Sequence, residues 1–256
     1  MQIHGTRCVV TGSSSGIGQA LTELLLKQGA FVVGIDHQTP LSLPSSPQFT
    51  SIIADLAQPH QVQSSYDQAK AVLGEVDLYI ANAGQARYGN DEDLSPEDNL
   101  LLWNLNVMAV IEACRIVRAD HDDQPFALVV LASAIAKLPL PGYSVYGATK
   151  AALAAYIQGI RYELSSGQSA HLVYPAATSS NFFSVSGQRH RSWFIQSPHH
   201  VAQRIVKGLQ SNRLDIYPSR LFRFFDAIMP FALRIYTARE SAIFQKQKGK
   251  PKGETS

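Results

Sequence analysis

A tyrosine and a lysine stand four residues apart in the segment Y-G-A-T-K at residues 146–150. At this spacing Tyr146 and Lys150 share one face of a helix. A free tyrosine, with a pKa of about 10, is a poor base at neutral pH, but a neighbouring ammonium lowers that pKa. Ser133 could hydrogen-bond a substrate oxygen where charge develops. The set predicts proton transfer, although a Tyr/Lys pair alone is usually an ordinary pair on a helix surface.

A glycine-rich turn, T-G-S-S-S-G-I-G, occupies residues 11–18 between a strand-like and a helix-like segment. Gly12 permits a tight turn, Gly16 lets the backbone approach a pyrophosphate, and Gly18 lets the helix pack closely on the sheet. The helix N-terminus then offers free N–H groups to phosphate. This context favours a dinucleotide site over a plain structural turn. The expected cofactor contacts in the turn are Gly12, Ser14, Ser15, Gly16, Ile17 and Gly18.

The second strand-like run, residues 31–35, ends at Asp36. A carboxylate there accepts both ribose hydroxyls of NAD and repels the 2′-phosphate of NADP. Ser15 directly precedes Gly16, and His37 directly follows Asp36. Neither carries a firm positive charge to offset that phosphate. NAD is therefore favoured and NADP stays open, while a strand-capping role for Asp36 is the structural alternative. Asp55, after the third strand, is either a partner for the adenine amino group or a turn aspartate.

Strand-like and helix-like segments alternate through the first 217 residues, which implies parallel strands joined by right-handed crossovers. Strands that are apolar on both faces fit a sheet covered by helices on both sides. The prediction is one doubly wound α/β domain over residues 1–218, with a seven-stranded parallel sheet and a helical, basic extension over residues 219–256. The expected strands are residues 8–10, 31–35, 51–54, 76–81, 126–131, 171–174 and 214–217, and the expected helices are 17–28, 61–73, 96–119, 143–164 and one that Ser197 and Pro198 cap.

Taken together, these motifs resemble the short-chain dehydrogenase/reductase family in its compact form. The resemblance covers about residues 5–217 and implies a Rossmann fold. It also implies an oxidoreductase that transfers hydride between NAD(P) and an alcohol or carbonyl substrate, as a homodimer or homotetramer built on the long helices. The residues that carry it are the turn at 11–18, Asp55-Leu56, Asn82-Ala83-Gly84, Asn106, Ser133, the 146–150 motif and Pro175.

The resemblance assigns roles to the matching positions. Tyr146 would be the general acid/base and Ser133 would position the substrate. Lys150 would lower the pKa of Tyr146 and bind the nicotinamide ribose. Asn106, preferred to Asn104 because it has the family's Asn-x-x-small spacing, would hold a water that relays protons to Lys150. The cofactor contacts implied after the third and fourth strands are Asp55, Leu56, Asn82, Ala83 and Gly84.

One segment departs from the family pattern. The family usually has Pro-Gly after the sixth strand and then a threonine that touches the carboxamide, whereas this chain has P-A-A-T-S-S-N at residues 175–181. Ala176 replaces the glycine, which is tolerable only if its backbone φ is below zero. Pro175 is an expected cofactor contact, and the residue that contacts the amide is either Thr178 or Ser180.

Substrate contacts are expected from loops beyond the carboxyl ends of the strands. These loops are residues 85–93, 134–143 and a lid at about 181–196. Aromatic lid residues favour an apolar or flat substrate, or else they anchor the lid to the body, and the substrate itself is not identified. The candidate substrate contacts are Ser133, Tyr143, Phe182 and Phe183.

Charge is divided unevenly along the chain. Residues 1–188 carry 9 Lys/Arg and 16 Asp/Glu, a net charge of −7, whereas residues 189–256 carry 13 and 4, a net charge of +9. Beyond residue 219, apolar residues and arginines follow an amphipathic helical pattern that Pro230 interrupts. This segment is expected to pack on the substrate cleft or a second subunit, or to lie on an anionic membrane surface over residues 219–240. No motif supports nucleic-acid binding.

Composition narrows the class of protein. The chain has 256 residues, 45% of them hydrophobic and 16% charged, with two cysteines, which excludes a disordered, collagen-like or disulfide-dense protein. The N-terminus does not read as a signal peptide, so a cytoplasmic protein is expected, and no Cys/His spacing suggests a metal site. The prediction is an NAD(H)-dependent oxidoreductase with a small-molecule substrate. The alternatives are an NADP(H)-dependent ketone reductase of the same family and a catalytically silent dinucleotide-binding scaffold.

Overall fold

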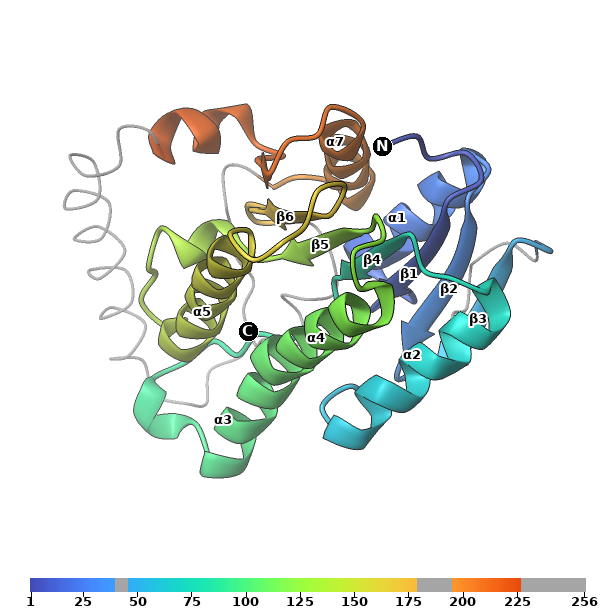
Figure 1. Cartoon of the computed structure of the whole chain (residues 1–256). Coiled ribbons are helices and arrows are strands. Elements are labelled where there is room, and N and C mark those ends of the chain that lie inside the picture. Colours follow the sequence, from blue (N-terminus) through green and yellow to red (C-terminus); the bar gives the residue numbers. More distant parts are fainter. Residues whose placement is uncertain (40–45, 179–194, 227–256) are drawn as a thin grey trace.

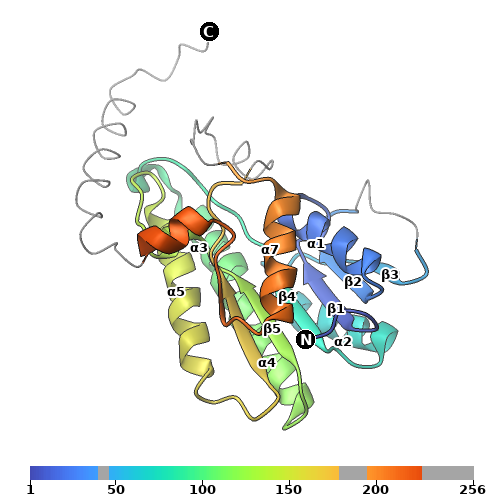
Figure 2. The ribbon, with the colours of Figure 1, turned by 90° about the horizontal axis from the view of Figure 1, so that it is seen from above.

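The computed structural model describes residues 1–39, 46–178 and 195–226 of the chain. Within these residues, seven parallel strands form one sheet in the order β3-β2-β1-β4-β5-β6-β7. Helices cover both faces of the sheet (Figures 1 and 2). The chain runs outward from β1 to β3, returns to the centre at β4 and then runs outward to β7, which confirms the doubly wound α/β prediction.

The elements follow the expected order, with bounds that differ by a few residues. The strands are β1 (Arg7–Thr11), β2 (Phe31–Asp36), β3 (Phe49–Ile53), β4 (Leu78–Ala81), β5 (Ala127–Leu131), β6 (Ser169–Val173) and β7 (Asp215–Ile216). The helices are α1 (Gly16–Lys27), α2 (Pro59–Leu73), α3 (Pro96–Trp103), α4 (Ala109–His121), α5 (Ser144–Ile160) and α7 (Pro198–Gln210). Short 3-10 turns are η1 (Asp91–Asp93) and η3 (Ala134–Ala136).

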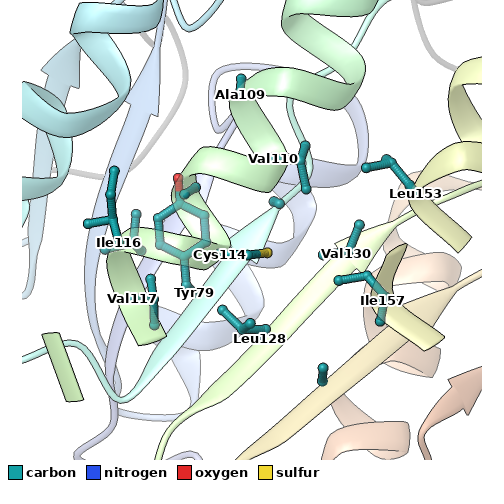
Figure 3. Packing of buried hydrophobic residues seen from close by; sticks show 14 of the residues in the cluster. Tyr79, Ala109, Val110, Cys114, Ile116, Val117, Leu128, Val130, Leu153 and Ile157 are labelled. Atoms are coloured by element: carbon teal, nitrogen blue, oxygen red, sulfur yellow. The ribbon is translucent and has the colours of Figure 1, made fainter. Parts of the chain in front are cut away.

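Apolar side chains fill a layer on each face of the sheet. On one face α1 and α7 pack on the strands through residues such as Leu21 and Ile205. On the other face α2, α4 and α5 cover the sheet, and Cys114 and Leu153 lie among the buried residues (Figure 3). Cys8 and Cys114 are both buried and free, as their apolar surroundings predict. Because all the strand pairs are parallel, the carboxyl ends of the strands meet at one edge of the sheet.

The long helix expected over residues 96–119 forms from Pro96 to His121, with a π-helical segment inside it. Its start is as predicted, because Ser95 Oγ accepts the Asp98 N–H at 3.0 Å and Pro96 takes the first helical position. Between α3 and α4 the chain forms a π-helical segment, η2 (Asn104–Met108). Such bulges are frequent at functional sites. Asn106 lies within this one and is fully buried.

Among the described residues, one helix has the length and composition to cross a membrane, the helix from Pro96 to His121. Half of the most apolar 18-residue stretch of this helix is buried inside the protein. The side chains that α4 contributes to the core, Val110 and Val117 among them, face the sheet (Figure 3). Packing on the sheet therefore accounts for the buried half of this apolar stretch.

Candidate active site

The predicted site residues gather along the edge of the sheet where the strands end. Gly12 follows β1, Asn82 follows β4, Ser133 follows β5 and Pro175 follows β6. Parallel strands end at the same edge, which places these residues side by side although they are far apart in sequence. Ser180, Phe182 and Phe183 lie outside the described residues, as does most of the expected lid.

The glycine turn has the backbone geometry that its glycines predict. Gly12 and Gly16 have φ values of +66° and +54°, a region that side chains disfavour. A Cβ on Gly18 would lie 1.9 Å from the Gly12 carbonyl oxygen, so this position admits no side chain. Ser15 caps α1 without a side-chain hydrogen bond to the helix. The first N–H groups of α1 are therefore available to an anion.

Side chains from β1 and β4 hold the turn in place. Asn82 Nδ2 donates to the carbonyl oxygens of Thr11 at 2.9 Å and Gly12 at 3.1 Å. Thr11 Oγ1 accepts the backbone N–H groups of Asn82 and Ala83, both at 3.0 Å. In this arrangement the Asn82 side chain braces the turn, so it acts on a cofactor site through the position of the turn.

Asp36 ends β2 beside the glycine turn and is buried. Its Oδ2 accepts the Ser14 N–H at 2.9 Å, and its Oδ1 lies 3.0 Å from Nδ1 of the exposed His37. The carboxylate therefore lies where the turn and the strand end meet, the position at which a ribose was expected.

Asp55 follows β3 and makes a local bond. Its Oδ1 accepts the Ala57 N–H at 3.0 Å, a turn bonded by an aspartate side chain. Leu56 is buried beside it. Of the two roles expected for Asp55, the described contacts support the turn aspartate.

Tyr146 and Lys150 lie on one face of α5, and both are buried. The Lys150 ammonium nitrogen is 5.9 Å from the centroid of the Tyr146 ring and donates to the Leu131 carbonyl at 2.9 Å. Ser133 shares a side-chain hydrogen bond with Tyr146. A hydroxyl pair with an ammonium beside it is thus assembled from β5, η3 and α5.

Burial has the largest effect on the pKa values of Tyr146 and Lys150. It raises the pKa of Tyr146, and the hydrogen bond with Ser133 offsets part of that rise. Burial also lowers the pKa of Lys150 to about 8. The Lys150 ammonium is bonded to a backbone carbonyl rather than to the phenol. The lowering of the Tyr146 pKa by Lys150, which the spacing predicts, therefore stays a prediction.

Asn106 clamps the loop that follows β4. Its Oδ1 accepts the Gln85 N–H and its Nδ2 donates to the Gln85 carbonyl, both at 2.8 Å, while Nδ2 also lies 3.2 Å from Thr149 Oγ1. A Cβ on Gly84 would lie 3.0 Å from Asn106 Oδ1 and 3.3 Å from Lys150 Nζ. The amide of Asn106 is thus engaged with the backbone, which makes it a brace beside Lys150. Sequence reasoning missed Gln85 and Thr149 because their contacts with Asn106 join distant segments.

The segment after β6 accommodates the departure from the family pattern. Among the described residues, the non-glycine residues with positive φ are Asp122 and Asn212, so Ala176 meets the condition that an alanine there requires. The Pro175 carbonyl accepts the Ala134 N–H at 2.8 Å. Thr178 is buried, and its hydroxyl donates to the Ala176 carbonyl at 3.0 Å.

An apolar cluster lies beside Tyr146. The Tyr143 ring is 6.1 Å from the Tyr146 ring and 5.1 Å from the Tyr88 ring, centroid to centroid. Ala86 and Ile135 complete the cluster. The two described loops expected to meet the substrate, residues 85–93 and 134–143, therefore pack on each other. Tyr143 was expected as a substrate contact, and that role stays a prediction. Tyr88 was not singled out, because its place in the sequence does not show that residues 85–93 fold onto residues 134–143.

Known proteins are similar to this chain in sequence and in fold. A 3-ketodihydrosphingosine reductase from Bos taurus is 27% identical over 235 residues, which cover 83% of this chain and 71% of that protein. The chain spans 66% and 65% of the length of two further curated relatives. A Burkholderia phymatum short chain dehydrogenase in complex with NAD is 19% identical, with a TM-score of 0.79 over 100% of this chain and 99% of that one.

A second solved structure, a Burkholderia cenocepacia short chain dehydrogenase in complex with NADP, is 22% identical. It has a TM-score of 0.81 over 94% of this chain and 99% of that one. At these identities the two structures show the fold. The model of the short chain dehydrogenase family matches residues 6–190, well over half of the chain. The chain therefore belongs to the short-chain dehydrogenase/reductase family.

Proposed function

We propose that the protein is an NAD(P)-dependent oxidoreductase that interconverts an alcohol and a carbonyl compound, with Tyr146 as the group that moves the proton. The observation that carries this proposal is the buried Tyr146 hydroxyl, bonded to Ser133 and flanked by Lys150, on the same sheet edge as the glycine turn.

The residues of the turn fit a dinucleotide. Side chains at Gly12 and Gly18 would collide with the Asn82 amide and with the Gly12 carbonyl oxygen, so glycine at both positions keeps the turn tight at the N-terminus of α1. Backbone N–H groups at such a terminus favour phosphate, and the buried carboxylate of Asp36 stands at the end of the adjacent strand. Gly12, Gly16, Gly18 and Asp36 would hold the cofactor.

A bound nicotinamide supplies the chemistry of hydride transfer. In the oxidative direction the Tyr146 phenolate takes the proton of the substrate hydroxyl. In the reductive direction the Tyr146 hydroxyl gives its proton to the oxygen of the carbonyl group. Ser133, bonded to Tyr146, donates to the same substrate oxygen while charge develops on it.

NAD is the proposed cofactor. A buried Asp36 carboxylate repels a 2′-phosphate and accepts ribose hydroxyls. The similar structures include complexes with NAD and with NADP, so both cofactors belong in the test.

The substrate is proposed to carry an apolar group beside the reacting carbon. Tyr143, Tyr88 and Ile135 form an apolar cluster next to Tyr146. The Bos taurus relative is named for the reduction of a keto compound, 3-ketodihydrosphingosine, which makes ketones a first choice for a substrate screen.

Assembly through the long helices is also proposed. Leu100 and Met108, on α3 and η2, are 61% and 54% exposed. Burying such apolar side chains against a second copy would stabilise a dimer. Sedimentation of the purified protein distinguishes a dimer or tetramer from a monomer.

The proposal is tested by titrating the protein with NAD(H) and NADP(H), then screening apolar ketones and secondary alcohols for a change in nicotinamide absorbance. We expect NAD(H) to bind more tightly than NADP(H) and at least one substrate to turn over. Binding without turnover across the screen would support a silent scaffold, and the absence of any nucleotide binding would contradict the proposed site.

A further inference from the structure

Three side chains from distant parts of the chain meet beyond β5, β6 and β7. The Lys137 ammonium donates to Tyr217 Oη and to Asp226 Oδ2, each at 2.7 Å. Tyr217 Oη donates to the same Asp226 oxygen, also at 2.7 Å. We call these residues the Lys137 cluster. Each member bonds the other two, so the cluster joins the segment after η3, the end of β7 and the C-terminal segment at one point.

Aromatic rings support the cluster from one side. The Lys137 nitrogen lies 4.7 Å from the centroid of the Tyr174 ring and 5.3 Å from that of Tyr217. These two rings are stacked, with centroids 5.1 Å apart, and Phe222 packs 6.0 Å from Tyr217. A cation over aromatic faces is attracted to them. Residues 220–226 are helical (Figure 2). The buried Phe222 and the bond of Asp226 to Lys137 hold them to the body.

The cluster is also connected to the catalytic serine. Lys137 ends η3, the short turn that Ser133 begins. The Lys137 N–H donates to the Ala134 carbonyl at 3.1 Å, and Ser133 Oγ accepts the Ile135 N–H at 3.3 Å. The start of η3 is fixed on Pro175 through the Ala134 N–H. The turn that carries Ser133 therefore has one anchor at each end, and the second anchor is the Lys137 cluster.

We propose that Lys137 is a positioning residue, which uses Asp226 and Tyr217 to hold η3 so that Ser133 stays within hydrogen-bond reach of Tyr146. This inference rests on the proposed function. It makes the first turns of the C-terminal extension a working part of the active site, although none of the three cluster residues touches the reacting atoms.

The pH dependence of turnover reports on this arrangement. The groups that face Tyr146 are Ser133, Tyr143 and Lys150. Of these, Ser133 lowers the pKa of Tyr146 through its hydrogen bond and Tyr143 raises it. If Ser133 moves away, the pKa of Tyr146 rises, and alcohol oxidation, which needs the phenolate, requires a higher pH.

A second cluster of the same composition provides a matched control. Tyr66 and Lys70 of α2 both bond to Asp120 of α4, with Tyr66 Oη at 2.8 Å from Asp120 Oδ2. The side chains of Asp120 and Asp226 are both 21% exposed. This cluster also joins two elements, but its described contacts do not include η3 or Tyr146. Removing Lys70 therefore tests the loss of a Lys–Asp–Tyr cluster without the connection to Ser133.

The experiment compares Lys137→Met, Lys137→Arg and Lys70→Met with the wild type in alcohol oxidation across pH, in NAD affinity and in thermal stability. We expect Lys137→Met to lower kcat about tenfold and to move the rising limb of the pH profile to higher pH, with NAD affinity unchanged. Lys137→Arg should restore most of the rate because it keeps the charge and the donors. Lys70→Met should lose stability and keep the wild-type pH profile.

A folded Lys137→Met enzyme with the wild-type kcat and pH profile overturns the inference. The same change in Lys70→Met also overturns it, because the effect would then be general loss of stability. If Lys137→Met does not fold, Asp226→Asn and Tyr217→Phe, which preserve side-chain size, are judged by the same two readouts. A wild-type enzyme that turns over no substrate contradicts the proposed function instead.

Discussion

The two halves of the active-site edge are built by different means. On the β1–β4 side, the glycine turn is shaped by backbone conformation at Gly12 and by a contact at Gly18 that admits no further atom. On the β5–β7 side, Ser133 and Tyr146 are placed by side-chain hydrogen bonds, with Lys137 as an anchor behind them. We expect nucleotide binding on the first side to be lost when a single atom is added to the turn. On the second side we expect activity to fall gradually as single hydrogen bonds are removed.

The largest effect is expected from Gly18→Ala. The new methyl group would lie 1.9 Å from the Gly12 carbonyl oxygen, so the turn must shift. We expect the free energy of unfolding to fall by about 3 kcal/mol or more and nucleotide binding to be lost. Denaturant unfolding and NAD titration measure both.

Gly159→Ala is the control for that substitution. A Cβ on Gly159, inside α5, meets no atom within 4 Å, so the variant should gain up to about 1 kcal/mol from helix propensity. Wild-type nucleotide affinity in Gly18→Ala would contradict the idea that close packing defines this half.

Burial of Lys150, on the β5–β7 side, predicts that the free energy of unfolding depends on pH. Its pKa is lowered from 10.5 to about 8, so between these values the folded state binds fewer protons than the unfolded state. This group's contribution to the free energy of unfolding therefore rises as the pH rises from about 8 to 10.5, by roughly 3 kcal/mol in total. Lys150→Met removes the contribution. Urea unfolding of both proteins across this range should show a wild-type minus variant difference that increases with pH, and a constant difference would contradict the buried ammonium.

A smaller change is expected from Asp36→Ser on the cofactor half. Loss of the carboxylate removes its repulsion of a 2′-phosphate, so the ratio of NADP to NAD affinity should increase about tenfold, or about 1.4 kcal/mol. The comparison variant is Asp55→Ser, which keeps an oxygen that can accept the Ala57 N–H. If Asp55 serves only its turn, both affinities stay at the wild-type values. An unchanged ratio in Asp36→Ser would remove the basis for preferring NAD.

The smallest expected effect concerns the outer face of the C-terminal helix. Phe224 and Phe225 are 63% and 41% exposed, and Arg220 and Arg223 flank them, so we propose that this face contacts anionic membranes. The double variant Phe224→Ser/Phe225→Ser should float several-fold less with vesicles rich in phosphatidylserine, at unchanged activity without vesicles. Ile53→Ser, at a side chain that is 55% exposed on β3, is the control. Equal flotation of all three proteins retires the membrane proposal.

Features of the molecule that depend on neighbouring residues were predictable from the sequence. The apolar runs indicated the strands, and Ser197 caps α7 as its position predicted. The glycine turn was predictable for the same reason, since close packing at Gly18 and positive φ at Gly12 restrict the residue types allowed there.

Contacts between distant residues were not predictable. The bonds of Lys137 to Tyr217 and Asp226 span 80 and 89 residues, and no local pattern indicates them. The clamp of Asn106 on Gln85 requires that a π-helical segment and a loop meet, which depends on how α3 and α4 pack. The contacts on the β5–β7 side are therefore the part of the site that only the structure reveals.

The proton-transferring role of Tyr146 is tested most directly by the turnover of Tyr146→Phe with a substrate that the wild type converts. The substitution removes the hydroxyl and keeps the ring that packs on Tyr143, so folding and NAD affinity should stay close to the wild type. We predict that kcat/KM falls about a thousandfold. A folded variant that binds NAD and retains the wild-type kcat/KM would contradict the assignment of Tyr146 as the acid/base.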